Sequence, residues 1–271
     1  MIDAHIHLDM YEDSQLTDML APLMQASNGP RTEAMQVTGL ITVSSQLESC
    51  RRNLQIAKRY PGLVHPAFGF HPEQPLPDDA AAADLFQWMR KHADDMVAIG
   101  EVGLPYYTAL EKRRAGERFD AEPYQELLEQ FVRLAGELNK PIVLHAVYED
   151  AAAACELLEK YNVSHAHFHW FKASRLVTER IIANQYSVSF TPDICYEPDI
   201  RQLAAVMPID KVMAETDGPW PFEGPFKGQA TVPRMAQRVI QEIAGLKRCS
   251  FQEAHALITQ NTASFYRLPP F

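Results

Sequence analysis

Eight short apolar runs alternate with longer amphipathic stretches along the whole chain. Several runs are continuous in Val, Ile, Leu or Phe, which is typical of parallel strands that are buried on both faces. The predicted strands are residues 2–6, 37–43, 63–68, 96–99, 142–144, 163–168, 186–190 and 212–214. This alternation favours folds in which a helix follows each strand.

The stretches between the predicted strands have helical periodicity. The predicted helices are residues 47–59, 79–92, 123–138, 149–160, 174–183, 199–206, 231–244 and 250–259. In the clearest of them, Leu127, Phe131, Leu134 and Leu138 fall on one stripe. We therefore predict an α/β fold in which the strands close into a single (β/α)8 TIM-type barrel, with a doubly wound open sheet as the competing architecture.

The length of the chain fits one such barrel. The chain has 271 residues, and about 250 are typical of this fold. We see no internal repeat, low-complexity tract or Gly/Ser linker, so residues 1–271 are predicted to form a single domain. Residues 12–34 are too many for a simple connection, and we expect a helix or a flap there.

Composition and charge exclude several classes of protein. Hydrophobic residues make up 46% of the chain and the formal net charge is -10, so a disordered chain and a broad basic face for nucleic acid are both excluded. The four cysteines form no CxxC pair, and no signal peptide or membrane-spanning run is visible. We expect a cytoplasmic protein without a membrane partner; its oligomeric state cannot be inferred.

Two histidines at the end of the first predicted strand give the sharpest functional signal. His5 and His7 are two residues apart, so their side chains point to the same side of a strand, which in a barrel is the interior. Two neutral imidazoles that converge in this way suit zinc or a transition metal. The alternative is a pair of buried histidines that hydrogen-bond to the backbone.

Further metal-binding residue types recur at the ends of later strands, where a barrel places its catalytic groups. A charged carboxylate at the end of a buried strand is costly unless it is paired or coordinated. Agreement among several strand ends therefore favours a metal site; the residues are Glu101, His145, His169 and Asp217. His165 and His167 have the same parity as His169, so the two-residue period alone does not choose among these three.

Several motifs together resemble the TatD-type metal-dependent hydrolases of the amidohydrolase superfamily. They run in family order from the first residues to the last: MIDAHIHLD, GFHP, GEVGL, KPIVLHA, AETDGPW and QNTASFYRL. The resemblance implies a barrel with two divalent metal ions, Zn²⁺, Mg²⁺ or Mn²⁺, at the carboxyl ends of the strands. It also implies hydrolysis by a metal-activated water.

The resemblance further implies a division of the metal ligands. His5, His7 and Asp217 would hold one ion, His145 and His169 would hold the other, and Glu101 would bridge the two. Asp217 would also be the general base. His169 is preferred over His167 because His169-Trp170-Phe171 is similar to the family's HCF segment. His71 and Glu73, around the HP motif, are expected to lie near the substrate.

Three departures from the family pattern affect the choice of substrate. Pro105 stands where family members commonly carry Asp. Trp170 and Lys172 lie in a segment that usually consists of small residues. Gly218 directly follows Asp217, which also departs from the family pattern. The leading expectation is hydrolysis of phosphodiester bonds in DNA. The alternatives are a small-molecule amide, lactone or ester hydrolase and, in another class, a non-catalytic metal-binding barrel.

Overall fold

The computed structural model describes residues 1–27 and 36–269, and its eight strands form one parallel sheet. Each strand pairs with the next along the chain, from β1 to β8. The strands are β1 (Ile2–Ile6), β2 (Gly39–Thr42), β3 (Val64–Phe68), β4 (Ala98–Gly103), β5 (Ile142–His145), β6 (Ala166–Phe168), β7 (Ser187–Phe190) and β8 (Val212–Ala214). This order confirms the predicted alternation of strands and helices.

The sheet closes on itself beside the first strand. The amide of Asp217, just after β8, donates to the carbonyl of His5 at 2.9 Å, and the amide of His7 donates to the carbonyl of Gly218 at 2.8 Å. These bonds join the two ends of the sheet, as expected for a (β/α)8 barrel. The open doubly wound sheet is excluded.

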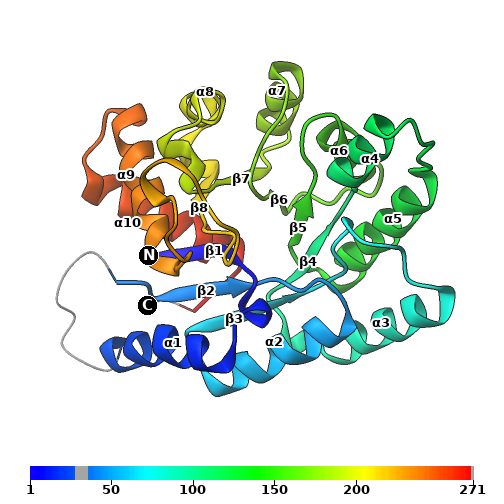
Figure 1. The fold of residues 1–271 in the computed structure, drawn as a ribbon, viewed down its shortest axis with the longest axis horizontal. Coiled ribbons are helices and arrows are strands. Elements are labelled where there is room, and N and C mark those ends of the chain that lie inside the picture. Colours follow the sequence, from blue (N-terminus) through cyan, green and yellow to red (C-terminus); the bar gives the residue numbers. More distant parts are fainter. Residues whose placement is uncertain (28–35, 270–271) are drawn as a thin grey trace.

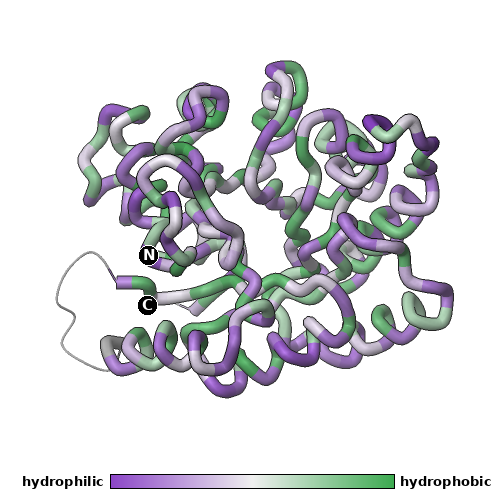
Figure 2. The backbone as a smooth tube through the Cα atoms, viewed as in Figure 1, coloured by the Kyte–Doolittle hydropathy of each residue, from purple (hydrophilic) through white to green (hydrophobic). Residues whose placement is uncertain are grey.

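Helices surround the barrel (Figure 1). They are α1 (Asp13–Ser27), α2 (Leu47–Arg59), α3 (Asp79–Lys91), α4 (Tyr106–Arg114), α5 (Glu122–Leu138), α6 (Asp150–Lys160), α7 (Arg175–Ala183), α8 (Pro198–Val206), α9 (Ala236–Lys247) and α10 (Phe251–Phe265). Hydrophobic residues are concentrated along the central strands, whereas hydrophilic and hydrophobic residues alternate along the helices (Figure 2). This pattern produces a core between strands and helices.

A second apolar cluster is formed mainly by side chains of the strands. It includes Val143 and Met213 together with Tyr266, which follows α10. Val143 comes two residues before His145, and Met213 comes two residues before Glu215. The two-residue period therefore places this apolar layer next to the polar strand ends.

The structure differs from the predicted elements in several places, of which three lie near the carboxyl ends of the strands or change the helix count. Strand β4 runs to Gly103, so Glu101 lies inside it rather than after it. Helix α4 was not predicted, because its sequence has no apolar stripe and none of its residues is buried. Helix α9 begins at Ala236, because Pro233–Met235 forms a separate 3-10 turn.

The long segment after the first strand contains the expected helix. Helix α1 covers Asp13–Ser27, and the remainder of the predicted region, residues 28–35, lies outside the described residues. Among the described helices, none combines the length and apolar character needed to cross a membrane.

Candidate metal centre

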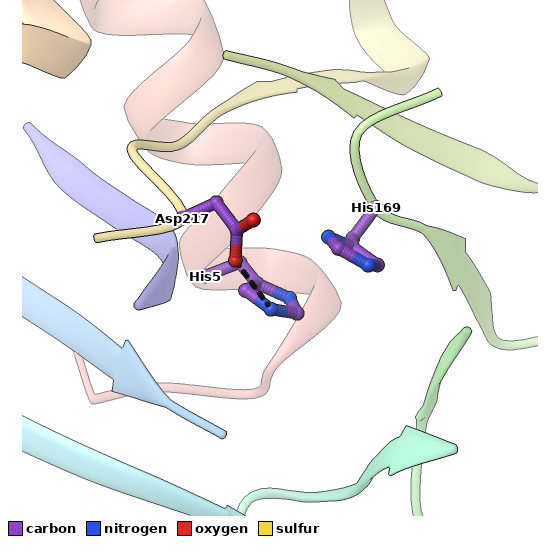
Figure 3. A group of neighbouring side chains, drawn as sticks. All are labelled: His5, His169 and Asp217. Carbon is purple, nitrogen blue, oxygen red and sulfur yellow. Dashed lines mark ion pairs between the residues drawn. The ribbon is translucent and has the colours of Figure 1, made fainter. Parts of the chain in front are cut away.

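Five strand ends bring the predicted metal ligands together at one end of the barrel. His5 and His7 come from the end of β1, Glu101 from β4, His145 from β5 and His169 from the residue after β6; Asp217 follows β8. All six are buried, with at most 7% of each exposed. Figure 3 shows His5, His169 and Asp217 facing a common space from three different segments.

The carboxylate of Glu101 divides the imidazoles into two groups. Its Oε2 atom lies 3.1 Å from Nε2 of His5 and 3.2 Å from Nε2 of His7. Its Oε1 atom lies 2.9 Å from Nδ1 of His145 and 2.6 Å from Nε2 of His169. One carboxylate therefore presents a different oxygen to each histidine pair.

Asp217 belongs to the first of these groups. Its Oδ1 atom lies 3.3 Å from Nε2 of His5 and 3.4 Å from Nε2 of His7. Nε2 of His5, Oε2 of Glu101 and Oδ1 of Asp217 are buried without a hydrogen-bond partner. Since buried polar atoms are normally satisfied, these convergent imidazole and carboxylate atoms fit divalent cations.

The protonation of the cluster reflects this mutual attraction. Burial lowers the pKa of His7, but its close contacts with the carboxylates of Asp217 and Glu101 outweigh this effect and raise the pKa to about 10. Burial raises the pKa of Asp217, but close contacts and charge interactions with His5 and His7 leave it below its usual range. In the absence of cations, protons on the imidazoles balance the carboxylates, so metal binding must displace protons.

The three histidines around β6 have different surroundings. His169 faces Glu101, whereas Nδ1 of His167 lies 2.7 Å from the hydroxyl of Tyr266 and Nε2 lies 2.6 Å from that of Ser189. Both nitrogens of His167 are thus engaged outside the cluster, and His165 is exposed. The geometry favours His169 as the ligand.

His71 and Glu73 both lie against the cluster, but in different ways. Nε2 of His71 is 3.3 Å from Oε1 of Glu101. The carboxylate of Glu73 accepts the amide hydrogens of Tyr107 and Thr108, at 2.7 Å each, where α4 begins. It also lies 3.3 Å from Nε2 of His145. Glu73 is therefore already engaged by protein groups rather than free for substrate.

A buried carboxylate beside the site, Glu215, was not predicted from the sequence. Glu215 is fully buried and accepts hydrogen bonds from the amide of Trp170 at 2.7 Å and the hydroxyl of Ser189 at 2.5 Å. Its Oε1 atom lies 3.6 Å from Nδ1 of His169. The signal was available, because Glu215 stands in the same AETDGPW segment as Asp217 and directly follows the last residue of β8.

A cavity of about 930 Å³ lies between α7 and α8. None of the six predicted metal ligands lines it, but Trp170, which follows His169, and Trp220, from the segment after Asp217, do. Trp170, Trp220 and Phe222 form an aromatic part of its lining. Phe226 packs in a small buried cluster with Phe222. Tyr106 and Tyr107 belong to the first turn of α4 and do not line the cavity.

A compact run of basic residues at the end of α4 does not line this cavity. Lys112, Arg113 and Arg114 occupy the exposed last turn of α4, and Lys112 pairs with Glu117 at 2.5 Å. None of the three, nor Arg118, lines the cavity. The run therefore does not supply a positive wall to it.

Residues 2–267 match the family model described as TatD related DNase. A Haemophilus influenzae protein described as an uncharacterized metal-dependent hydrolase is 36% identical over 99% of this chain and 100% of its own length. Human deoxyribonuclease TATDN3 is 26% identical over 98% of this chain and 94% of its own. The crystal structure of YjjV, a TatD homolog from Escherichia coli K12, matches with a TM-score of 0.81 at 24% identity, covering 99% of this chain and 98% of that one.

Proposed function

The chain belongs to the TatD family of metal-dependent hydrolases, and from this premise we propose that it hydrolyses phosphodiester bonds of DNA with a metal-activated water. The observation that carries the proposal is the carboxylate of Glu101, whose two oxygens face separate histidine pairs. The preference for phosphodiesters is supported by the name of the human relative, a deoxyribonuclease. We place this activity in the cytoplasm, with the substrate as a partner and no membrane association.

Two donor groups would hold two divalent cations. The first comprises His5, His7, Asp217 and Oε2 of Glu101; the second comprises His145, His169 and Oε1 of Glu101. The imidazoles suit Zn²⁺, and the carboxylates also admit Mg²⁺ or Mn²⁺. Bound cations would lower the pKa of water from 15.7 toward about 7 and stabilise negative charge on the reacting oxygens.

Asp217 is the residue that we assign as general base. Its carboxyl is ionised in the metal-free cluster, because the neighbouring imidazoles lower its pKa, and a bound cation would also favour the ionised form. Like His7 and His145 it is 7% exposed, whereas His5 and Glu101 are fully buried, so it lies on the more accessible side of the cluster. It can therefore accept the proton of the attacking water while His5 and His7 hold it in place.

An Asp217→Asn variant tests the proposal. Wild-type and variant proteins, loaded with Zn²⁺, Mn²⁺ or Mg²⁺ and checked by elemental analysis, would be assayed on single- and double-stranded DNA. We expect kcat of the metal-loaded variant to fall by about 10²–10⁴-fold, the range for general acid–base groups. Asp210→Asn, the same change at an exposed position before β8, is the matched control.

Two results would count against this assignment. If the Asp217→Asn variant with full metal occupancy still turns over DNA, Asp217 is not the general base. If the metal-loaded wild type does not cleave DNA, the proposed nuclease activity is wrong. If it turns over no ester or amide either, the non-catalytic metal-binding barrel is favoured.

A small-molecule ester, amide or lactone is the second candidate substrate, because the cavity is acidic. Its lining contains five carboxylates and two basic residues: Glu179, Asp193, Glu197, Asp199 and Glu223 against Lys172 and Arg175. Arg175 is already paired with Glu179 at 2.8 Å. A nucleic acid strand that continued through this cavity would meet like charge, whereas a short neutral substrate would not.

A further inference from the structure

One carboxylate connects helix α4 to the metal centre. Oε1 of Glu73 accepts the amide hydrogen of Tyr107 at 2.7 Å, and Oε2 accepts the amide and hydroxyl hydrogens of Thr108 at 2.7 and 2.6 Å. These are the first-turn amides of α4, which otherwise lack a partner within the helix. Oε1 also lies 3.3 Å from Nε2 of His145. Glu73 thus has two structural partners at the same time.

The ring of His145 is held between two carboxylates. Its Nδ1 atom faces Oε1 of Glu101 at 2.9 Å and Nε2 of His169 at 3.3 Å, whereas its Nε2 atom faces Glu73. A neutral imidazole has one N–H and one lone pair, and only the lone pair can bind a metal. An ionised carboxylate only accepts hydrogen bonds, so Glu73 requires the hydrogen of His145 to be on Nε2.

We propose that Glu73 is a positioning residue that fixes the tautomer and ring orientation of His145, so that the Nδ1 lone pair points into the second donor group. This inference rests on the proposed two-cation centre and assigns a role to a residue that the sequence placed near the substrate. Glu73 is itself held by the first turn of α4, through the amides of Tyr107 and Thr108, which keeps its carboxylate beside His145.

A simpler role for Glu73 is to cap α4 only, and two variants separate the roles. Thr108→Val removes the hydroxyl bond to Glu73 but leaves the contact between Glu73 and His145. Glu73→Gln keeps a carbonyl oxygen that can still accept the hydrogen of His145, whereas Glu73→Ala removes every acceptor. If Glu73 only capped α4, any effect of Thr108→Val or Glu73→Gln on metal binding would follow the effect of the same substitution on the stability of the protein.

The experiment measures metal binding to four proteins: the wild type, Glu73→Ala, Glu73→Gln and Thr108→Val. Zn²⁺ titrations against a competing chelator give the affinity of each binding step, and circular dichroism checks folding. We expect Glu73→Ala to weaken one of the two steps by about 10–100-fold, the range for partners of metal-bound histidines, and to leave the other unchanged. Glu73→Gln should recover part of this loss, and Thr108→Val should bind both ions like the wild type.

Long-range ¹H–¹⁵N spectra of the Zn²⁺-loaded proteins provide a readout that capping alone would not change. The His145 signal should show hydrogen on Nε2 in the wild type, Glu73→Gln and Thr108→Val, and should lose exchange protection in Glu73→Ala. Unchanged zinc affinity in Glu73→Ala would overturn the inference, as would equal weakening by Thr108→Val. If His145→Asn does not reduce the zinc stoichiometry of the protein, the two-cation centre itself fails, which is a different result.

Discussion

At the residue scale, the charge balance of the cluster depends on histidines that share two buried carboxylates. His7 contacts both Glu101 and Asp217, at 3.2 and 3.4 Å. Its pKa is raised to about 10 because these contacts outweigh the effect of burial. The unfolded chain would titrate the same imidazole near pH 6.5. The folded, metal-free protein therefore binds this proton more tightly than the unfolded chain.

This difference predicts a pH dependence of stability in the metal-free protein. The contribution of charged His7 to the free energy of unfolding is fully present below about pH 6.5 and is lost as the pH rises toward about 10. The stability difference between wild type and His7→Asn, from urea unfolding in chelator, should therefore shrink over this window. Taking the difference cancels groups that titrate in both proteins. A difference that grew with pH would contradict the assigned direction.

The sequence could predict the residue types of the centre but not all of its contacts. Motif order singled out His5, His7, Glu101, His145 and Asp217, and the structure brings them together. Strand parity could not separate His167 from His169, because both face the same side. The similarity to the family's HCF segment favoured His169, but the hydroxyls of Ser189 and Tyr266 that engage His167 come from distant segments and could not be predicted.

At the element scale, the last helix carries a residue that completes the barrel interior. Tyr266 follows α10 and is 2% exposed. Its hydroxyl lies 2.7 Å from Nδ1 of His167 on β6 and donates to the carbonyl of Ala4 on β1 at 3.3 Å. The end of the chain thus holds the first and sixth strands together.

Tyr266→Phe should therefore destabilise the protein. Removing the hydroxyl leaves Nδ1 of His167 buried without a partner, which costs about 1–3 kcal/mol in the free energy of unfolding. Denaturant unfolding of the metal-loaded protein measures the loss. Tyr124→Phe is the control, because that hydroxyl bonds the carbonyl of Gln74 in a half-buried setting, and its loss should be smaller. Equal effects of the two substitutions would argue against a special role for Tyr266.

Elements were predictable where the apolar pattern was regular. Helix α2 was predicted over its full length, because its buried residues recur at helical spacing. Helix α4 could not be predicted from apolar spacing, because it has no buried face and its first turn is held by Glu73 from another loop. Strand β4 extends beyond its apolar run because Gly103 pairs with His145, where a Cβ atom would lie 1.8 Å from the carbonyl oxygen of His145.

At the scale of the whole molecule, fold and charge lead to different expectations about the substrate. The alternation of eight strands and their helices predicted the barrel with a doubly wound sheet as the competitor, and the order of the family motifs predicted that the six candidate ligands lie at one end of it. The acidic cavity was not predictable, because its lining comes from segments around β6, β7 and β8 that meet only after folding. The net charge of -10 opposes association with DNA, as the carboxylates of this cavity do.

Neutralising two of these carboxylates tests whether DNA enters the cavity. Glu197→Gln with Asp199→Asn removes two exposed negative charges from the lining. If DNA passes there, kcat/KM on single-stranded DNA should rise several-fold at low salt, because like-charge repulsion is removed. The gain should disappear near 0.2 M salt, where the screening length is below about 8 Å. Asp210→Asn, which changes charge away from the cavity, should show no gain. If the double variant leaves cleavage of DNA unchanged at every salt concentration, the strand takes another route, and a short substrate becomes the better occupant of the cavity.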